Sequence, residues 1–150
     1  MAEFKYAKGR IIESLQFIAG ESREFDQEYA FKTWEDYQSD KKAQKLIDRT
    51  IENILTALIE VCGTILTQQN IAVENYAQVL SECAKKFSFS VQEQEALSKL
   101  ALQRNRLAHR YLNLRWQAVA MFKEQRPLIN RILAKIMDYE LSEIKKIRKS

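Results

Sequence analysis

A short stretch, residues 104–111 (RNRLAHRY), holds the side chains of this protein that could do chemistry together. His109 is the only histidine of the chain, and histidine suits proton transfer because its pKa lies near neutrality. Arg104 offers a fork of donors that matches phosphate oxygens and does not lose its charge. This pair indicates chemistry at a phosphate ester. Asn105 could orient the imidazole or hold a phosphate oxygen.

Cleavage of RNA without a metal needs the tasks that these residue types perform. A base takes the proton of the 2′-hydroxyl, an acid protonates the leaving 5′-oxygen, and cations hold the added charge of the phosphorane. One histidine cannot be base and acid at once in one site. Two copies of the chain in a symmetric dimer would supply both groups.

The stretch is expected to lie on a helix that begins after Ser90, which forms a capping box with Glu93, and ends near residues 111–113. Apolar residues recur there at spacings of three, four and seven. On an ideal helix, Arg104 falls in a stripe with four less polar residues, Leu97, Ala101, Ala108 and Tyr111. Because a charge in an apolar stripe is costly unless it is paired or faces a polar cavity, Arg104 is expected at such a place.

Arg104 and His109 would not face the same way on that helix. Five residues separate them, which is about 140° around an ideal helix, whereas Asn105 and His109 are neighbours at a spacing of four. Arg104 and His109 can meet one phosphate only where the helix end lies at a groove. A two-fold dimer interface would provide such a groove.

The other elements are also predicted to be helices, because the chain has three glycines and one proline. They are expected at Phe4–Ala19, ended by Gly20; at Lys41–Gln68, capped by Asp40; at Tyr76–Lys86, capped by Asn75; at Arg115–Lys123; and from Pro127 to about Ile147, before a frayed tail. Short connections favour antiparallel packing. We therefore predict one all-α domain over residues 1–150, an antiparallel bundle of four to five helices.

Several classes of protein are disfavoured by the sequence. Cys62 and Cys83 lie in apolar helical patterns, as buried thiols of a reducing compartment do, and their spacing does not suggest a metal site. The first residues lack the plan of a signal peptide, and we expect no membrane span of about 20 apolar residues. A cytoplasmic protein without a bound metal is expected.

Charge is unevenly distributed along the chain. Residues 21–40 hold seven acids, whereas residues 96–137 hold nine lysines and arginines against the single acid Glu124. The basic region contains the stretch 104–111, which favours a polyanionic partner such as RNA, although solvated helix faces would give the same pattern. The acidic region carries five aromatic residues that could form a partner surface or cap the bundle: Phe25, Tyr29, Phe31, Trp34 and Tyr37.

The stretch 104–111 resembles the R-x4-H-x-Y motif of HEPN-domain ribonucleases. It is most similar to the HEPN toxins that are encoded beside a minimal nucleotidyltransferase antitoxin. The resemblance extends from about Lys41 to Ile136, because a long apolar helix, a short helix opening with Asn75-Tyr76-Ala77 and the motif helix follow in the same order. Residues 21–40 have no counterpart in it.

The resemblance implies a symmetric, HEPN-like dimer with the activity of a metal-independent endoribonuclease toxin in a type VII-like toxin–antitoxin pair. Arg104 and His109 would be catalytic and Asn105 supporting, with no cofactor of the chain's own. The partner nucleotidyltransferase would use ATP to attach AMP to Tyr111, and the added bulk and negative charge would block the groove. The RNA would be tRNA or mRNA, with tRNA favoured.

Each residue of the site also has a structural interpretation. His109 could be a structural histidine, and Arg104 could form an ion pair with Glu60 or Glu82. Tyr111 could pack with its hydroxyl in water. These interpretations fit a second function, a non-catalytic helical adaptor that binds a nucleotidyltransferase or nucleic acid.

Arg106 and Arg110 are the remaining cations of the stretch. They are candidates for contacts with RNA phosphates, because arginine pairs readily with phosphate oxygens. Solvated side chains at these two positions would look the same in the sequence.

Overall fold

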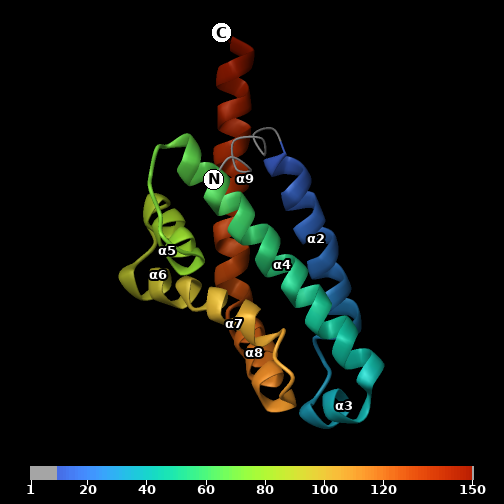
Figure 1. The fold of residues 1–150 in the computed structure, drawn as a ribbon. Coiled ribbons are helices and arrows are strands. Elements are labelled where there is room, and N and C mark those ends of the chain that lie inside the picture. Colours follow the sequence, from blue (N-terminus) through green and yellow to red (C-terminus); the bar gives the residue numbers. More distant parts are fainter. Residues whose placement is uncertain (1–9, 150) are drawn as a thin grey trace.

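The structure is a computed structural model that describes residues 10–149, and these form helices and no strand (Figure 1). The helices are α2 (Ile11–Glu28), α3 (Trp34–Ser39), α4 (Lys41–Gln68), α5 (Tyr76–Lys86), α6 (Val91–Ser98), α7 (Leu100–Arg106), α8 (Leu112–Glu124) and α9 (Arg126–Lys149). The predicted all-α helical bundle is confirmed. Helix α9 continues to Lys149, two residues beyond the end predicted near Ile147.

Helix α4 is the centre of the bundle. It contacts α2, α3, α5, α7 and α8, and it contributes many of the fully buried isoleucine and leucine side chains of the core. By length and composition alone, α4 could cross a membrane, but 67% of its most apolar window is buried inside the protein. Figure 1 shows α2 alongside α4, with α9 crossing behind α4 and extending past the other helices.

Polar caps start the helices where the sequence predicts them. The Asp40 side chain accepts a hydrogen bond from the backbone N–H of Ala43 at 3.0 Å, and Asn75 accepts one from Gln78 at 2.9 Å. Ser90 and Glu93 form the predicted reciprocal capping box of α6. Such bonds satisfy backbone donors that a helix start leaves free. The predicted bounds of α4 and α5 are confirmed.

The prediction for the first helix is wrong at its end. Its start at Phe4 lies outside the described residues, but its end at Gly20 does not hold, because α2 runs through Gly20 to Glu28. Glycine weakens a helix interior by only about 1 kcal/mol relative to alanine. Burial of Ile18 and Phe25 on either side of Gly20 outweighs that cost.

The acidic, aromatic region 21–40 caps the lower end of the bundle in Figure 1. Phe25 and Tyr37 are buried, and the Tyr37 ring packs against Trp116 of α8 with 5.0 Å between ring centroids. Asp26 accepts two hydrogen bonds from Arg126, at 2.8 and 2.9 Å. The region therefore packs on the basic half of the chain, as a cap does, although Phe31 stays exposed.

Cys62 of α4 and Cys83 of α5 are free and fully buried. The contact with Cys83, together with burial, raises the pKa of the Cys62 thiol well above its ordinary value. Both thiols are therefore small apolar groups of the core, as the sequence predicts.

A substitution at Gly20 tests whether α2 is continuous through this residue. A Cβ atom built there meets nothing within 4 Å, so Gly20→Ala should raise the free energy of unfolding by about 0.5–1 kcal/mol through lower backbone entropy of the unfolded chain. Urea denaturation measures the change. Ala19→Gly, at the exposed position next to it, is the matched control and should lower stability by a similar amount. A Gly20→Ala protein less stable than the natural chain would contradict a continuous α2.

Candidate functional site

The stretch 104–111 spans a helix end and a turn, which corrects the prediction of one helix from Val91 to residues 111–113. That helix is interrupted at Lys99, and its second part, α7, ends at Arg106. After α7, the backbone hydrogen bonds join residues three positions apart, as in a tight turn: Ala108 N–H donates to the Asn105 carbonyl, and His109 N–H donates to the Arg106 carbonyl. The predicted stripe is therefore broken, because Ala108 and Tyr111 lie outside the helix and are exposed.

Burial of Leu107 explains why the turn forms where it does. Leu107 is buried while the three residues after it are exposed. Helix α8 then begins at Leu112, where the extended backbone of Tyr111 serves as its N-cap. The predicted neighbouring of Asn105 and His109 on one helix flank does not occur, because His109 lies in the turn.

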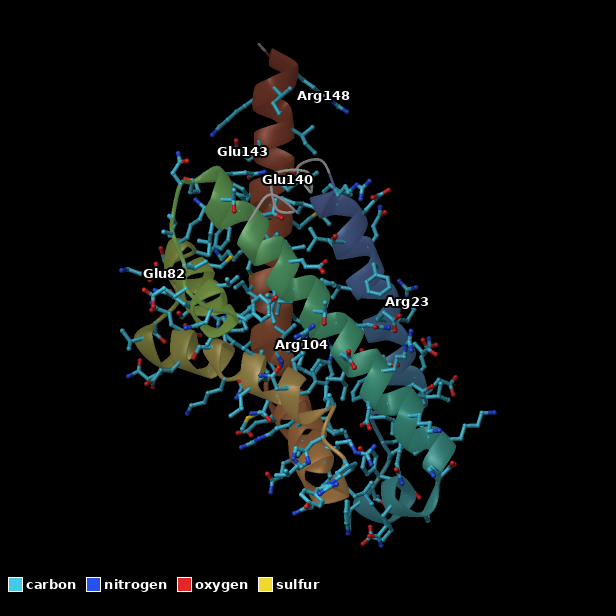
Figure 2. The ribbon with its side chains drawn as sticks, viewed as in Figure 1. Arg23, Glu82, Arg104, Glu140, Glu143 and Arg148 are labelled. Atoms are coloured by element: carbon cyan, nitrogen blue, oxygen red, sulfur yellow. The ribbon has the colours of Figure 1, made fainter. Side chains whose placement is uncertain are left out.

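Arg104 is half-buried and is held by two uncharged groups. Its Nε donates a hydrogen bond to Thr56 Oγ1 of α4 at 2.7 Å. Its guanidinium carbon lies 5.7 Å from the ring centroid of Tyr76, at the start of α5. No ion pair with Glu60 or Glu82 forms among the described residues, and Figure 2 shows Glu82 well away from Arg104. The structural ion-pair interpretation of Arg104 is therefore wrong.

A cavity of about 350 Å³ opens beside Arg104. Helices α2 and α4 form most of its wall, with Thr56 and Glu60 among the α4 residues, and Tyr76 adds an aromatic side. Arg104 thus lies at a cavity with polar and apolar lining residues and does not sit sealed in the core. An arginine in this position keeps its charge and can meet an anion that enters the cavity.

His109 is exposed in the turn, and its orientation is fixed locally. The backbone N–H of Tyr111 donates a hydrogen bond to His109 Nδ1 at 3.2 Å, and the centroids of the His109 and Tyr111 rings are 4.8 Å apart. A ring nitrogen that accepts a hydrogen bond is unprotonated, so the neutral ring carries its proton on Nε2. Nε2 is then the nitrogen that can donate to a substrate. The hydrogen bond needs only a backbone N–H at position 111, whereas the ring contact needs an aromatic residue there.

The Tyr111 hydroxyl is accessible and lies beside a cation. Tyr111 is 51% exposed. Arg110 Nη2 donates a hydrogen bond to the Tyr111 hydroxyl at 3.2 Å, and its guanidinium carbon is 5.1 Å from the ring centroid. Tyr111 is therefore not a packing residue of the core.

Arg106 and Asn105 complete the stretch. Arg106 Nη1 donates a hydrogen bond at 3.3 Å to the side-chain oxygen of Gln103, which is buried. Asn105 is exposed, and its side chain has no hydrogen-bond partner within residues 10–149. Within residues 10–149, no hydrogen bond, ion pair or ring contact joins Arg104 to His109: Arg104 contacts Thr56 and Tyr76, whereas His109 contacts Tyr111.

The arginines of the stretch differ from the other arginines of the basic region in their partners. Arg115, Arg126 and Arg131 form ion pairs with Asp48, Asp26 and Glu93 respectively. The three arginines at 104, 106 and 110 contact uncharged groups instead. Folding therefore neutralises part of the basic region and leaves unpaired positive charge around the turn, where a polyanion could bind.

A buried polar network fixes the start of α8 behind the turn. Asp48 of α4 accepts a hydrogen bond from the Tyr37 hydroxyl at 2.7 Å and pairs with Arg115 of α8 at 2.8 Å. Burial raises the pKa of the Asp48 carboxyl, while the hydrogen bonds from Tyr37 and Arg115 oppose that rise. Burial and the bond to Asp48 raise the pKa of Tyr37 far above its ordinary value.

Sequence reasoning missed this network, although one signal was present. Asp48 lies on the buried side of α4, four residues after the buried Gln44 and three before the buried Ile51. A carboxylate in the apolar period of a helix predicts a buried partner. The sequence does not show which arginine provides it. Among residues 10–149, no three His, Cys, Asp or Glu side chains gather as a metal site would need.

Comparison with known proteins identifies a family that the chain matches. The family model described as ribonuclease HepT-like matches residues 15–136, which include the whole stretch 104–111. No curated protein sequence matches the chain.

Removal of Asp48 tests how much the buried network contributes to the free energy of unfolding. Asp48→Ala leaves Arg115 and Tyr37 without their partner, so the free energy of unfolding should fall by about 3 kcal/mol. Urea denaturation followed by helical circular dichroism measures the loss. Asp26→Ala breaks the more exposed Arg126 pair and should cost less than about 1 kcal/mol. Equal losses in the two variants would show that the buried network stabilises the fold no more than the exposed ion pair does.

Proposed function

The chain belongs to the ribonuclease HepT-like family, and from this membership we propose that it is a metal-independent endoribonuclease that uses Arg104 and His109. The observation that carries the proposal is the family match over residues 15–136. This range contains an exposed histidine beside arginines that form no ion pair with a described carboxylate. These are the groups that phosphodiester cleavage requires.

The proposed reaction is an internal transfer at phosphorus. The 2′-oxygen attacks the phosphorus and loses its proton to a base, and the bond from phosphorus to the 5′-oxygen breaks. The 5′-oxygen takes a proton from an acid, which leaves a cyclic phosphate and a free 5′-hydroxyl. Arg104 would stabilise the added charge of the phosphorane with its Nη groups, because its Nε is engaged by Thr56.

A dimer would complete the site. A single chain has one histidine, and among its described residues no hydrogen bond or ring contact joins His109 to Arg104. In a symmetric dimer, His109 of one protomer would act as base, which requires its Nδ1 to part from the Tyr111 N–H. His109 of its partner would act as acid, with both arginines at one phosphate. Arg106 and Arg110 would contact neighbouring phosphates, and Asn105 would support the imidazole or a phosphate oxygen. We favour tRNA as the substrate.

Regulation is proposed to act through Tyr111, in a type VII-like toxin–antitoxin pair. A minimal nucleotidyltransferase antitoxin would bind ATP, and the Tyr111 oxygen would attack its α-phosphorus. The phenolic proton would leave to solvent and pyrophosphate would depart, so that AMP becomes linked to the tyrosine. Arg110 already donates to the Tyr111 hydroxyl, so it would lie beside the new phosphate. The added negative charge would repel RNA.

A second function has its own support, a helical adaptor that binds a nucleotidyltransferase or nucleic acid without cleaving it. In the described conformation His109 Nδ1 is occupied by the Tyr111 N–H, and a general base needs an unprotonated nitrogen free for its substrate. The adaptor binds RNA without turnover, so a cleavage assay separates the two functions.

His109→Ala tests the catalytic proposal. The purified natural chain should cleave total RNA in EDTA, and His109→Ala should lower the rate by at least about 100-fold, because proton transfer is lost. Gel analysis and sequencing of the RNA ends give the rate and the cleavage position.

Gln117→Ala, at an exposed position of α8 outside the stretch, is the control and should cleave at the natural rate. Circular dichroism should show the same helicity in both variants. A His109→Ala protein that cleaves as fast as the natural chain would exclude His109 from catalysis. RNA binding without cleavage by the natural chain would favour the adaptor.

Tyr111→Phe tests the modification. After incubation with a nucleotidyltransferase encoded beside it and with ATP, the natural chain should gain the mass of one or more AMP units and lose ribonuclease activity. Tyr111→Phe should gain none, because it lacks the attacking oxygen. Tyr76→Phe is the matched control, since Tyr76 is also half-exposed, and it should be modified like the natural chain. AMP mapped to a residue other than Tyr111 by peptide mass spectrometry would refute the assignment.

A further inference from the structure

The cavity beside Arg104 has a lining that the cleavage reaction alone does not explain. Its volume of about 350 Å³ lies in the range of roughly 300–1,000 Å³ that is usual for small-ligand sites. Cleavage at a phosphate needs the guanidinium of Arg104, but it needs neither a hollow between α2 and α4 nor an aromatic wall. Both are present here, because Tyr76 and the apolar side chain of Ile59 line the cavity.

The guanidinium of Arg104 is held in one orientation. The bond from its Nε to Thr56 Oγ1, at 2.7 Å, fixes one edge of the planar group. The Tyr76 ring, with its centroid 5.7 Å from the guanidinium carbon, restrains its position from a second side. Among residues 10–149, no side chain pairs with the edge that carries the two Nη groups, so that edge can bind two oxygens of one phosphate.

Among the described residues that line the cavity, the charges have a small positive excess: Arg10 and Arg104 are cationic and Glu60 is acidic. A second hollow shares Arg104 and Glu60 and adds Glu13 and Glu52, so the anion is expected on the Arg10 side of Arg104. The hydroxyls of Ser14, Thr56 and Thr64 add uncharged groups that can donate or accept. An anionic group with hydroxyls attached, such as a sugar phosphate, would find partners for both of its parts.

Tyr76 supplies the third element of a nucleotide site. Tyr76 is 54% exposed although it lies at the wall of a cavity, so part of its ring stays open to a ligand. Bases stack on such rings irrespective of their sequence, and the loss of one stacking ring costs about 1–3 kcal/mol per base. A guanidinium and an aromatic ring in contact therefore offer adjacent places for a phosphate and for its base.

We propose that this cavity binds one nucleotide of the RNA, with its phosphate on Arg104 and its base stacked on Tyr76. The proposal rests on the proposed function, because it makes the cavity the place where the strand is held next to the bond that is cut. Thr56 is a positioning residue in it, since Thr56 acts through Arg104. Binding would hold the ribose and phosphate in place, and no bond need change for it to be measured.

The experiment compares two ligands that differ only in the base. AMP and ribose 5-phosphate contain no phosphodiester bond to cleave, so titration calorimetry can use the natural full-length chain. AMP should bind about tenfold or more tightly than ribose 5-phosphate. Tyr76→Ala should abolish that difference, and Tyr76→Phe, which keeps the ring, should preserve it. Arg104→Ala should weaken the binding of both ligands.

Phe31→Ala is the matched control, because Phe31 is an exposed aromatic residue outside the cavity, and it should retain the natural preference for AMP. Equal affinity of the natural chain for the two ligands would overturn the proposal, as would an unchanged preference in Tyr76→Ala. Failure here with RNA still cleaved would refute the nucleotide site alone. Failure of cleavage with the preference for AMP intact would refute the ribonuclease function and leave the cavity as a nucleotide site.

Discussion

Burial of α4 on most of its circumference is the constraint on which the rest of this structure depends. Seven of its isoleucine and leucine side chains are at most 1% exposed, and each contributes about 1.5–3 kcal/mol when it leaves water. Burial on this scale requires neighbours on several sides, which α2, α3, α5, α7 and α8 provide. It also outweighs the cost of placing one carboxylate, Asp48, inside the protein, provided that the carboxylate finds partners.

The partners of Asp48 connect the core to the site. Tyr37 comes from the acidic half of the chain and Arg115 from the basic half, and both reach the same carboxylate. Because Arg115 lies in the first turns of α8, its pairing fixes the helix that starts immediately after Tyr111. The 107–111 turn is thus held between the buried Leu107 and an anchored α8. His109 can then be exposed while its orientation stays set by the Tyr111 backbone.

The distribution of charge has a similar double role. Acidic residues outside the stretch 104–111 pair with arginines that hold helices together, as Asp26 does with Arg126. The arginines of the stretch bind uncharged groups, which leaves their charge available to an anion. Part of the positive charge of the basic region is therefore used in ion pairs between helices. The rest lies on the arginines of the stretch 104–111, and only this part could attract an anion.

The sequence by itself determined the all-α class, the bounds of α4 and α5, the start of α6 and the residue types that stand together in the stretch 104–111. These depend on interactions between residues at most a few positions apart, such as the caps at Asp40, Asn75 and Ser90, or on the residue types themselves. The tertiary structure decided the rest. It carried α2 through Gly20, ended the motif helix at Arg106 without a glycine or proline, and placed Arg104 against Thr56, 48 positions earlier. Such outcomes follow from which side chains the core must bury, and that depends on residues far apart in the chain, whose approach no local pattern records.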